Sequence, residues 1–219
     1  MYSFTEENYL KAIYKLQERH EDAVNTNSIA ASLETKAASV TDMIKKLSAK
    51  DLLIYEKYKG VQLTALGKRI AIDTVRKHRL WETFLVEKLK FSWDEVHELA
   101  EELEHIQSEK LIDKLDEFLG FPAHDPHGDP IPQRDGIIKQ RSLFLLSELV
   151  DGQKGIVSGV VDHSSVFLQY LEKMNLVLGK QIRVTEQNQF DKSYQILLNE
   201  TENLHISVEV AKNVLVRLI

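Results

Sequence analysis

The sequence predicts a mainly α-helical chain with a small β domain, an α+β fold. Apolar residues keep helical spacing from Ser3 to Leu119, whereas short alternating segments with polar turns dominate beyond Gln140. All four prolines lie between these regions, which predicts a stiff linker: Pro122, Pro126, Pro130 and Pro132. We therefore expect three domains: residues 1–74, residues 75–140 including the linker, and residues 141–219.

Composition narrows the class of protein. The chain has 219 residues, of which 43% are hydrophobic, and it has no cysteine, which excludes disulfides and thiolate metal ligands. No apolar run is long enough to span a membrane, and the N-terminus lacks the order of a signal peptide. We therefore expect a cytoplasmic protein.

The net charge of −6 hides an uneven distribution of charge. Residues 35–80 hold eleven Lys and Arg against four Asp and Glu, whereas residues 91–135 hold three against thirteen. A basic segment is suited to phosphates and an acidic one to cations. Charged helices with solvated faces would show the same counts, so this pattern does not decide the function alone.

The first 64 residues have the pattern of three helices and a hairpin. The capping box Ser3-Phe4-Thr5-Glu6 opens the first helix, and Asn25 or Thr26 can cap a short second helix. The third helix is marked by apolar residues at helical spacing: Val40, Met43, Ile44 and Leu47. Residues 53–63 alternate and turn at Lys59-Gly60, as a hairpin would. This order predicts a winged helix-turn-helix.

In such a domain the third helix enters the major groove of DNA, so small side chains at its start allow close approach. The hairpin would contact the phosphate backbone with its lysines. The candidate DNA-contacting residues are Lys36, Ala37, Ala38, Ser39, Thr41, Lys45 and Lys46 on the helix and Lys57 and Lys59 on the wing. Any three-helix domain shows this periodicity, so the DNA interpretation depends on the order of the helices, the hairpin and the localised positive charge together.

The middle region combines helices with metal-binding side chains. Thr64 caps a helix to about Lys90, a second capping box at residues 92–95 opens a helix to about Gln107, and a further helix runs from Ser108 to Gly120. The second of these helices carries two imidazoles and two carboxylates on one arc: His97, Glu101, Glu104 and His105. His78 and Glu82 are four residues apart on the first, and Asp125 and His127 lie in the linker.

Such donors suit a divalent transition metal. A solvated acidic arc or a weak surface ion pair would have the same spacing, and these alternatives remain open. A metal-dependent enzyme is a further alternative. However, His97-Glu98-Leu99-Ala100-Glu101 lacks the second histidine of a zinc protease motif, and the sequence has one E-x-x-H where a di-iron bundle needs two.

The C-terminal region predicts a small β-barrel. One helix is expected at Ser165–Asn175. The expected strands are Gly155–Val161, Gln181–Glu186, Tyr194–Leu198, His205–Val208 and Val214–Ile219.

Several motifs resemble one family of regulators. They are Glu7–Tyr14, Ser39-Val40-Thr41, Lys77–Glu82, His97, Glu101 with Glu104-His105, and Pro126–Pro132. On these residues the chain resembles the diphtheria-toxin-repressor family, which includes the manganese-transport repressors. Leu146–Leu149 and the strand order resemble the SH3-like domain of ferrous-iron transport accessory proteins. The resemblance implies a homodimeric, metal-dependent repressor that binds double-stranded operator DNA of metal-uptake genes.

The resemblance also implies two metal sites. The primary site would use Asn8, Glu101, Glu104 and His105, and the second would use His78, Glu82 and His97 with Asp162 from the C-terminal domain. Longer relatives add ligands at the positions of Asp125 and His127. Two departures matter: Asn8 stands where relatives have Asp or Met, and Lys11 replaces a carboxylate of the two-metal cluster in short manganese repressors. We therefore expect two separate sites.

The donor set bears on which metal binds. Iron-responsive relatives have a cysteine at the position of Glu101, whereas every candidate here is an oxygen or imidazole donor. Hard oxygen donors favour Mn²⁺, with Fe²⁺ next. We expect Zn²⁺ and Co²⁺ to bind in vitro as well.

Overall fold

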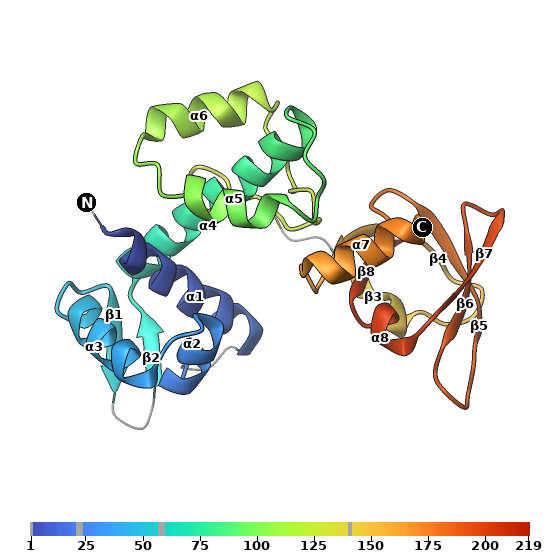
Figure 1. The fold of residues 1–219 in the computed structure, drawn as a ribbon, viewed down its shortest axis with the longest axis horizontal. Coiled ribbons are helices and arrows are strands. Elements are labelled where there is room, and N and C mark those ends of the chain that lie inside the picture. The colour runs from blue at the N-terminus through green and yellow to red at the C-terminus, as the bar shows by residue number, and fades with distance from the viewer. Residues whose placement is uncertain (1, 21–23, 57–59, 140–141) are drawn as a thin grey trace. The chain divides into compact units, whose positions relative to one another are not determined.

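The computed structural model describes residues 2–20, 24–56, 60–139 and 142–219. The chain forms two compact units. The first is Met1–His78 with Glu101–Ile112 and Pro132–Ile138, and the second is Arg79–Ala100 with Asp113–Ile131 and Lys139–Ile219. Figure 1 labels the helices and strands. Within the described residues, no helix is both long and apolar enough to cross a membrane.

The first unit contains the predicted winged helix-turn-helix. Its elements are α1 (Phe4–His20), α2 (Thr26–Ser32), α3 (Ala37–Ser48), β1 (Leu53–Glu56), β2 (Gly60–Leu63) and the start of α4 (Ala65–Glu87). β1 and β2 pair antiparallel to form the wing. The three helices and the wing pack around one apolar core, in which Ile13, Ile29, Ile44 and Val61 are fully or almost fully buried.

Local capping explains where the first helices begin. At α1, the Glu6 amide donates to Ser3 Oγ at 3.3 Å and the Ser3 amide donates to Glu6 Oε2 at 3.1 Å, so the predicted capping box is confirmed. At α2, Asn25 rather than Thr26 is the cap, because Asn25 Oδ1 accepts from the Ser28 amide at 2.8 Å.

The middle helices are α5 (Val96–Leu103) and α6 (Glu109–Phe118), and α5 is shorter than predicted. Residues 93–95 form a turn, and the helix ends before Glu104. Glu104 and His105 therefore do not share a helical arc with His97 and Glu101, and that prediction was wrong. The physical reason is that both side chains are buried in polar contacts with residues outside α5, contacts that replace the next helical turn.

The proline-rich segment, predicted as a stiff linker, is a loop that packs against other residues of the second unit. In the second unit, the Val160 amide donates to the His127 carbonyl oxygen at 3.0 Å, and His127 is fully buried. Gly128 allows this contact: it has a φ of +91°, and an added Cβ would lie 2.1 Å from the Ser158 carbonyl oxygen. The loop therefore packs against β4.

The C-terminal domain is a six-stranded antiparallel sheet in the order β3-β8-β4-β5-β6-β7. It also contains α7 (Ser165–Lys173), α8 (Val208–Ala211) and a 3-10 turn at Leu146–Glu148. The strands are β3 (Phe144–Leu145), β4 (Lys154–Val160), β5 (Gln181–Gln187), β6 (Tyr194–Leu198), β7 (Glu202–Ile206) and β8 (Val214–Leu218). This is the predicted α+β class with an SH3-like C-terminal domain.

One predicted strand is misplaced. We expected a strand at His205–Val208, whereas β7 ends at Ile206 and Val208 begins α8. Ser207 separates the two elements, because its hydroxyl accepts from the Val210 amide at 3.2 Å and caps the helix.

Candidate metal centres

Glu104 is the centre of a polar group buried in the first unit. Its side chain is 0% exposed, and its Oε2 lies 2.7 Å from His78 Nδ1. Its Oε1 lies 2.5 Å from Lys11 Nζ and 3.9 Å from His105 Nε2. A buried carboxylate with imidazoles on both oxygens can bind a divalent cation.

The first turns of α1 supply oxygen donors to the same unit. Glu7 Oε2 lies 2.6 Å from His105 Nδ1, and Glu7 Oε1 accepts from Gln107 Nε2 at 2.8 Å. Asn8 Oδ1 is buried and makes no hydrogen bond to any described residue. A buried oxygen without a donor is destabilising by about 1–3 kcal/mol, which a bound cation would remove. The unpartnered oxygen therefore fits the expectation that Asn8 ligates a metal.

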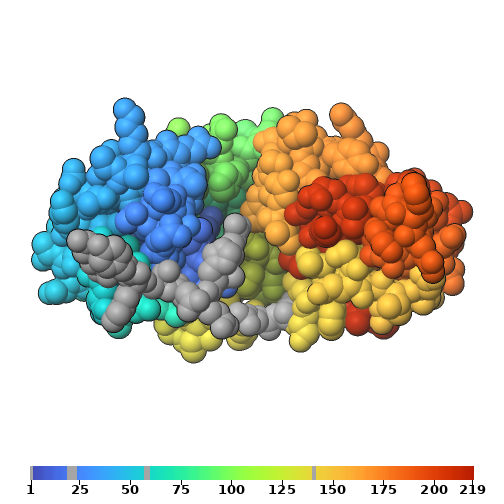
Figure 2. All heavy atoms as spheres, turned by 90° about the horizontal axis from the view of Figure 1, so that it is seen from below, coloured from blue at the N-terminus to red at the C-terminus, as the bar shows by residue number. Residues whose placement is uncertain are grey.

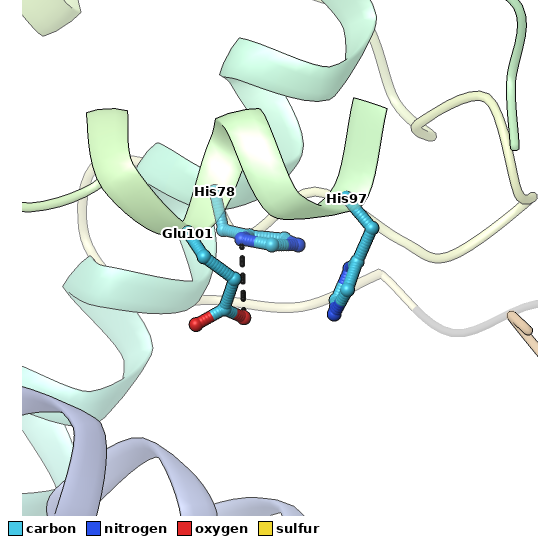
Figure 3. A group of neighbouring side chains, drawn as sticks. All are labelled: His78, His97 and Glu101. Carbon is cyan, nitrogen blue, oxygen red and sulfur yellow. Dashed lines mark ion pairs between the residues drawn. The ribbon is translucent and has the colours of Figure 1, made fainter. Parts of the chain in front are cut away.

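His78 and Glu101 form an ion pair with 3.8 Å between His78 Nδ1 and Glu101 Oε1 (Figure 3). His97 lies one turn before Glu101 on the same helix, α5. We had expected His78 to act with Glu82 at the second site. The structure instead places its Nδ1 against Glu104 and Glu101, because α4 turns His78 toward the residues that follow α5.

A second group lies within the second unit. Glu82, Asp125 and His127 are all buried, and each offers a ligand atom within 4.8 Å of the others. Glu82 Oε2 lies 3.5 Å from His127 Nδ1, and Glu82 Oε1 lies 3.3 Å from His97 Nδ1. The linker residues and a helix residue are thus combined in one candidate site.

The orientation of His127 suits a metal ligand. Its Nε2 donates to the Trp93 carbonyl oxygen at 2.7 Å, and its ring stacks on those of Trp93 and His163. Its buried Nδ1 makes no hydrogen bond within the described part of the chain. A ring that is held through Nε2 and directs Nδ1 toward the Glu82 carboxylate at 3.5 Å can present Nδ1 to a metal bound by the same carboxylate.

The charges around His127 favour a cation. Burial lowers the pKa of His127, but Glu82, Asp125 and the Trp93 carbonyl outweigh it and raise the pKa to about 9. Burial, Glu82 and Asp129 raise the pKa of Asp125 to about 7, against the lowering effect of Arg79 and His127. Without a metal, this group therefore retains protons that a divalent ion would replace.

Asp125 has a second function in its own loop. Its Oδ1 accepts from the His127 and Asp129 amides at 2.9 and 3.0 Å, and its Oδ2 lies 3.6 Å from Arg79 Nε. Arg79 also pairs with Asp129 at 3.0 Å and donates to the Pro130 carbonyl at 2.6 Å. These contacts hold the loop that positions His127.

Asp162 lies outside both groups. Its Oδ1 accepts from the Ser164 amide at 2.8 Å, just before α7, and Asp162 is in neither cluster of described metal donors. The expected contribution of Asp162 is therefore not found, because its carboxylate is engaged in the turn that starts the helix. The neighbouring residue His163 instead stacks on His127 with ring centroids 4.9 Å apart.

The candidate DNA-contacting residues lie at the start and along the outer face of α3. Lys36, Ala37, Ala38 and Ser39 are exposed. In the space-filling view, the light-blue segment that includes α3 lies at the surface (Figure 2). Thr41 Oγ1 donates to the Ala37 carbonyl at 3.0 Å, so its hydroxyl is partly engaged within the helix.

The lysines of α3 and of the turn that follows it differ in their partners. Lys45 Nζ lies 3.4 Å from the exposed Asp42, whereas Lys46 and Lys50 pair with the buried Glu6 at 3.0 and 2.7 Å. Glu6 and its two lysines tie α3 to α1. Lys57 and Lys59, expected on the wing, lie outside the described residues.

Sequence reasoning missed the contacts of Glu7, Lys11, Arg79 and His163. For Glu7 and Lys11 a signal was available, because they lie four residues apart on one face of α1 and Lys11 is three residues after Asn8. For Arg79 and His163 the sequence carried no such signal, because their partners are brought near only by the fold of the linker loop.

A winged helix-turn-helix followed by helices with buried acid–imidazole groups defines a DNA-binding protein with metal-binding capacity. Comparison of the sequence with known protein families supports this class. Residues 1–61 match the N-terminal DNA-binding domain of iron-dependent repressors, residues 64–133 their metal-binding and dimerisation domain, and residues 144–218 the FeoA domain.

Individual relatives agree with these matches. The chain is 34% identical over 119 residues to the HTH-type transcriptional regulator MntR of Bacillus subtilis, covering 54% of this chain and 82% of that one. It is 35% identical over 128 residues to the iron-dependent repressor IdeR of Mycobacterium leprae, covering 58% and 55%. The chain thus spans about half the length of the first curated relatives that it matches.

Solved structures extend the likeness to the full chain. A manganese-dependent transcriptional repressor in complex with manganese has a TM-score of 0.87 and 34% identity, covering 98% of this chain and 100% of that one. ScaR with bound Cd²⁺ has a TM-score of 0.78 and 34% identity, covering 98% and 99%. The chain belongs to the diphtheria-toxin-repressor family of metal-dependent transcriptional repressors.

Proposed function

We propose that this chain is a manganese-responsive repressor that binds operator DNA of metal-uptake genes as a homodimer. Such a function places the chain in the cytoplasm. Metal bound by Asn8, Glu104 and His105 would select the conformation that fits DNA, rather than contribute DNA contacts itself.

The observation that carries this proposal is the first turn of α1. Glu6 there pairs with Lys46 of the DNA-reading helix α3 and with Lys50 in the turn after it, and the adjacent Glu7 contacts His105. Asn8 follows with its unpartnered oxygen. A cation bound at this turn would therefore act on the helix that positions α3. All these residues lie in the first unit, so the proposed metal site and the helix α3 are linked within that unit.

The choice of manganese rests on the donors. The candidate ligands of the first group are carboxylate, amide and imidazole groups, without a thiolate, and this set favours Mn²⁺ with Fe²⁺ next. Solved relatives are described as manganese-dependent or with bound Cd²⁺ or Zn²⁺. Zn²⁺ and Co²⁺ are therefore expected to bind in vitro.

The proposal of a homodimer rests on apolar surface. Three large apolar side chains of the second unit, Leu89, Phe118 and Phe121, are exposed, the last two by 63% and 69%. Protein interfaces are enriched in aromatic side chains relative to the rest of the surface. Two-fold pairing through the helices at residues 93–119 would present two copies of α3 to successive turns of DNA.

The test is DNA binding by the full chain after chelator treatment. Duplexes selected from a random library in the presence of Mn²⁺ would serve as the operator probe, with affinity measured with and without the metal. We expect at least about 100-fold tighter binding with Mn²⁺, which corresponds to about 3 kcal/mol. Equal affinity in both conditions would contradict the metal-responsive function and favour a DNA-binding protein whose metal is structural.

Glu104→Gln is the matched variant for this test. It retains the shape of the side chain but removes the charge at the centre of the first group, so it should eliminate activation by Mn²⁺. The control is Glu98→Gln, which changes an exposed glutamate on the adjacent helix α5. Loss of activation in both variants would show that the effect is not specific to the site. Metal-dependent turnover of a substrate without DNA binding would favour the enzyme alternative.

A further inference from the structure

Lys11 is a buried cation held between two carboxylates. Its side chain is 7% exposed, and its Nζ lies 2.7 Å from Glu101 Oε1 and 2.5 Å from Glu104 Oε1. The other oxygen of Glu104 faces His78 Nδ1 at 2.7 Å, and the same nitrogen lies 3.8 Å from Glu101 Oε1. The ammonium group is therefore surrounded by donors that also suit a divalent ion.

Two carboxylates that approach one position in a buried site repel each other unless a cation lies between them. The ammonium of lysine is a compact point charge. Its distances to the two oxygens exceed the metal–oxygen bond lengths of Mg²⁺ or Zn²⁺, about 2.0–2.2 Å, by only about half an ångström. Lys11 can thus provide the positive charge that a metal would otherwise supply at this position.

We propose that the ammonium of Lys11 is a built-in cation that fills one of two cation positions in this group. The group then binds one divalent ion, on the side of Asn8 and His105, and Lys11 determines that number. This inference rests on the proposed function, since it concerns the metal group of the first unit. An ordinary structural ion pair would instead have no effect on how many ions bind.

The test is a Mn²⁺ titration of the full chain and of Lys11→Met after chelator treatment. Calorimetry would give the heats, and the resonance signal of unbound Mn²⁺ would count the bound ions. The methionine side chain keeps the apolar stem and removes the charge. We expect Lys11→Met to bind one Mn²⁺ per chain more than the wild-type protein. An unchanged number of bound ions would overturn the proposal.

Lys77→Met is the matched control. Lys77 is equally buried, with 7% of its side chain exposed, but it pairs with the exposed Asp73 at 2.7 Å rather than with candidate ligands. It should bind as many ions as the wild-type protein. Without metal, both variants should unfold at a lower temperature than the wild-type protein, and saturating Mn²⁺ should remove this difference from the wild-type protein only in Lys11→Met. Equal restoration in both would also overturn the proposal.

Lys11→Gln provides a further variant if the methionine protein does not fold without metal. Its neutral amide should also allow an additional Mn²⁺, and the same count decides the outcome. These measurements do not involve DNA. A wild-type protein that binds Mn²⁺ but shows no metal-dependent DNA binding would contradict the proposed function, whereas the count in the Lys11 variants decides the present inference separately.

Discussion

The group around Glu104 and the group around Glu82 use the same kinds of donor but balance their charge differently. Glu104 has Lys11 as its permanent cation at 2.5 Å. Glu82 faces His127, whose proton can leave, with 3.5 Å between Glu82 Oε2 and His127 Nδ1. The first group therefore has a permanent positive charge, whereas the second can lose its positive charge by releasing the proton of His127 to the solvent.

The two groups also differ in what they hold together. The first contacts α1 through Glu7, which belongs to the winged domain. The second contacts the linker loop through Asp125 and His127 and the turn before α5 through Trp93. We therefore expect the first group to control DNA binding and the second to control the stability of its own unit.

The largest effect expected from this comparison is that of His105→Ala against His127→Ala. Loss of His105 removes the partner of Glu7 and a metal donor, so DNA affinity at saturating Mn²⁺ should fall by about 100-fold or more. His127→Ala should lower it by less than about 10-fold. Fluorescence anisotropy with the selected duplex measures both, with the exposed His205→Ala as control. The reverse order of effects would exchange the roles of the two groups.

Next in size is the opposite pH dependence of the two regions in metal-free protein. The pKa of His127 is raised from 6.5 to about 9, so its contribution to stability is complete below pH 6.5 and is lost as the pH rises through 9. Burial opposes ionisation of Glu6, but hydrogen bonds from Lys50, Lys46 and Ser3 lower its pKa from 4.5 to about 2. Its contribution is present above pH 4.5 and is lost as the pH falls toward 2.

The size of each loss is on the order of 1–3 kcal/mol, since one pKa unit corresponds to about 1.4 kcal/mol and Lys46 and Lys50 are partly solvated. Both tryptophans, Trp81 and Trp93, lie in the second unit, so their fluorescence reports its unfolding at alkaline pH. Hydrogen exchange of α1 peptides reports the acid effect. His127→Gln should remove the loss of stability at alkaline pH, and Glu6→Gln should remove the loss at acid pH. If either loss persisted in its variant, the residue assigned to it would be wrong.

A smaller effect is expected from Asn8→Asp. The substitution replaces an unpartnered amide oxygen by a charged one, so Mn²⁺ affinity of the first group should rise by about tenfold, or about 1.4 kcal/mol. Asn25→Asp is the control, because Asn25 caps α2 with its side-chain oxygen and an aspartate can do the same. Calorimetric titration compares the two. Unchanged affinity in Asn8→Asp would show that Asn8 is not a ligand.

The smallest effect is expected from Asp162→Asn. The amide oxygen can still accept from the Ser164 amide, and the residue lies outside both groups of described donors. Mn²⁺ affinity should therefore change by less than about twofold. A loss of tenfold or more would return Asp162 to the second site and show that metal binding rearranges the turn before α7.

Most of the local structure could be predicted from the sequence alone. Capping boxes and helical spacing predicted α1, α3 and the order of helices and wing, because these signals depend on residues within a few positions of each other. It also determined which donor types are present: carboxylates, imidazoles and an amide, without a thiol. The family resemblance followed from these motifs.

Which of the candidate metal-donor side chains lie together could be seen only in the tertiary structure. His105 meets Glu7 across 98 positions of the sequence, and Glu104 meets Lys11 across 93, distances over which no periodic pattern operates. The end of α5 at Leu103, the grouping of His78 with Glu104, and the packed loop that holds His127 depend on burial of polar side chains against distant elements. Such burial requires partners, and the chain finds them only once its helices have packed.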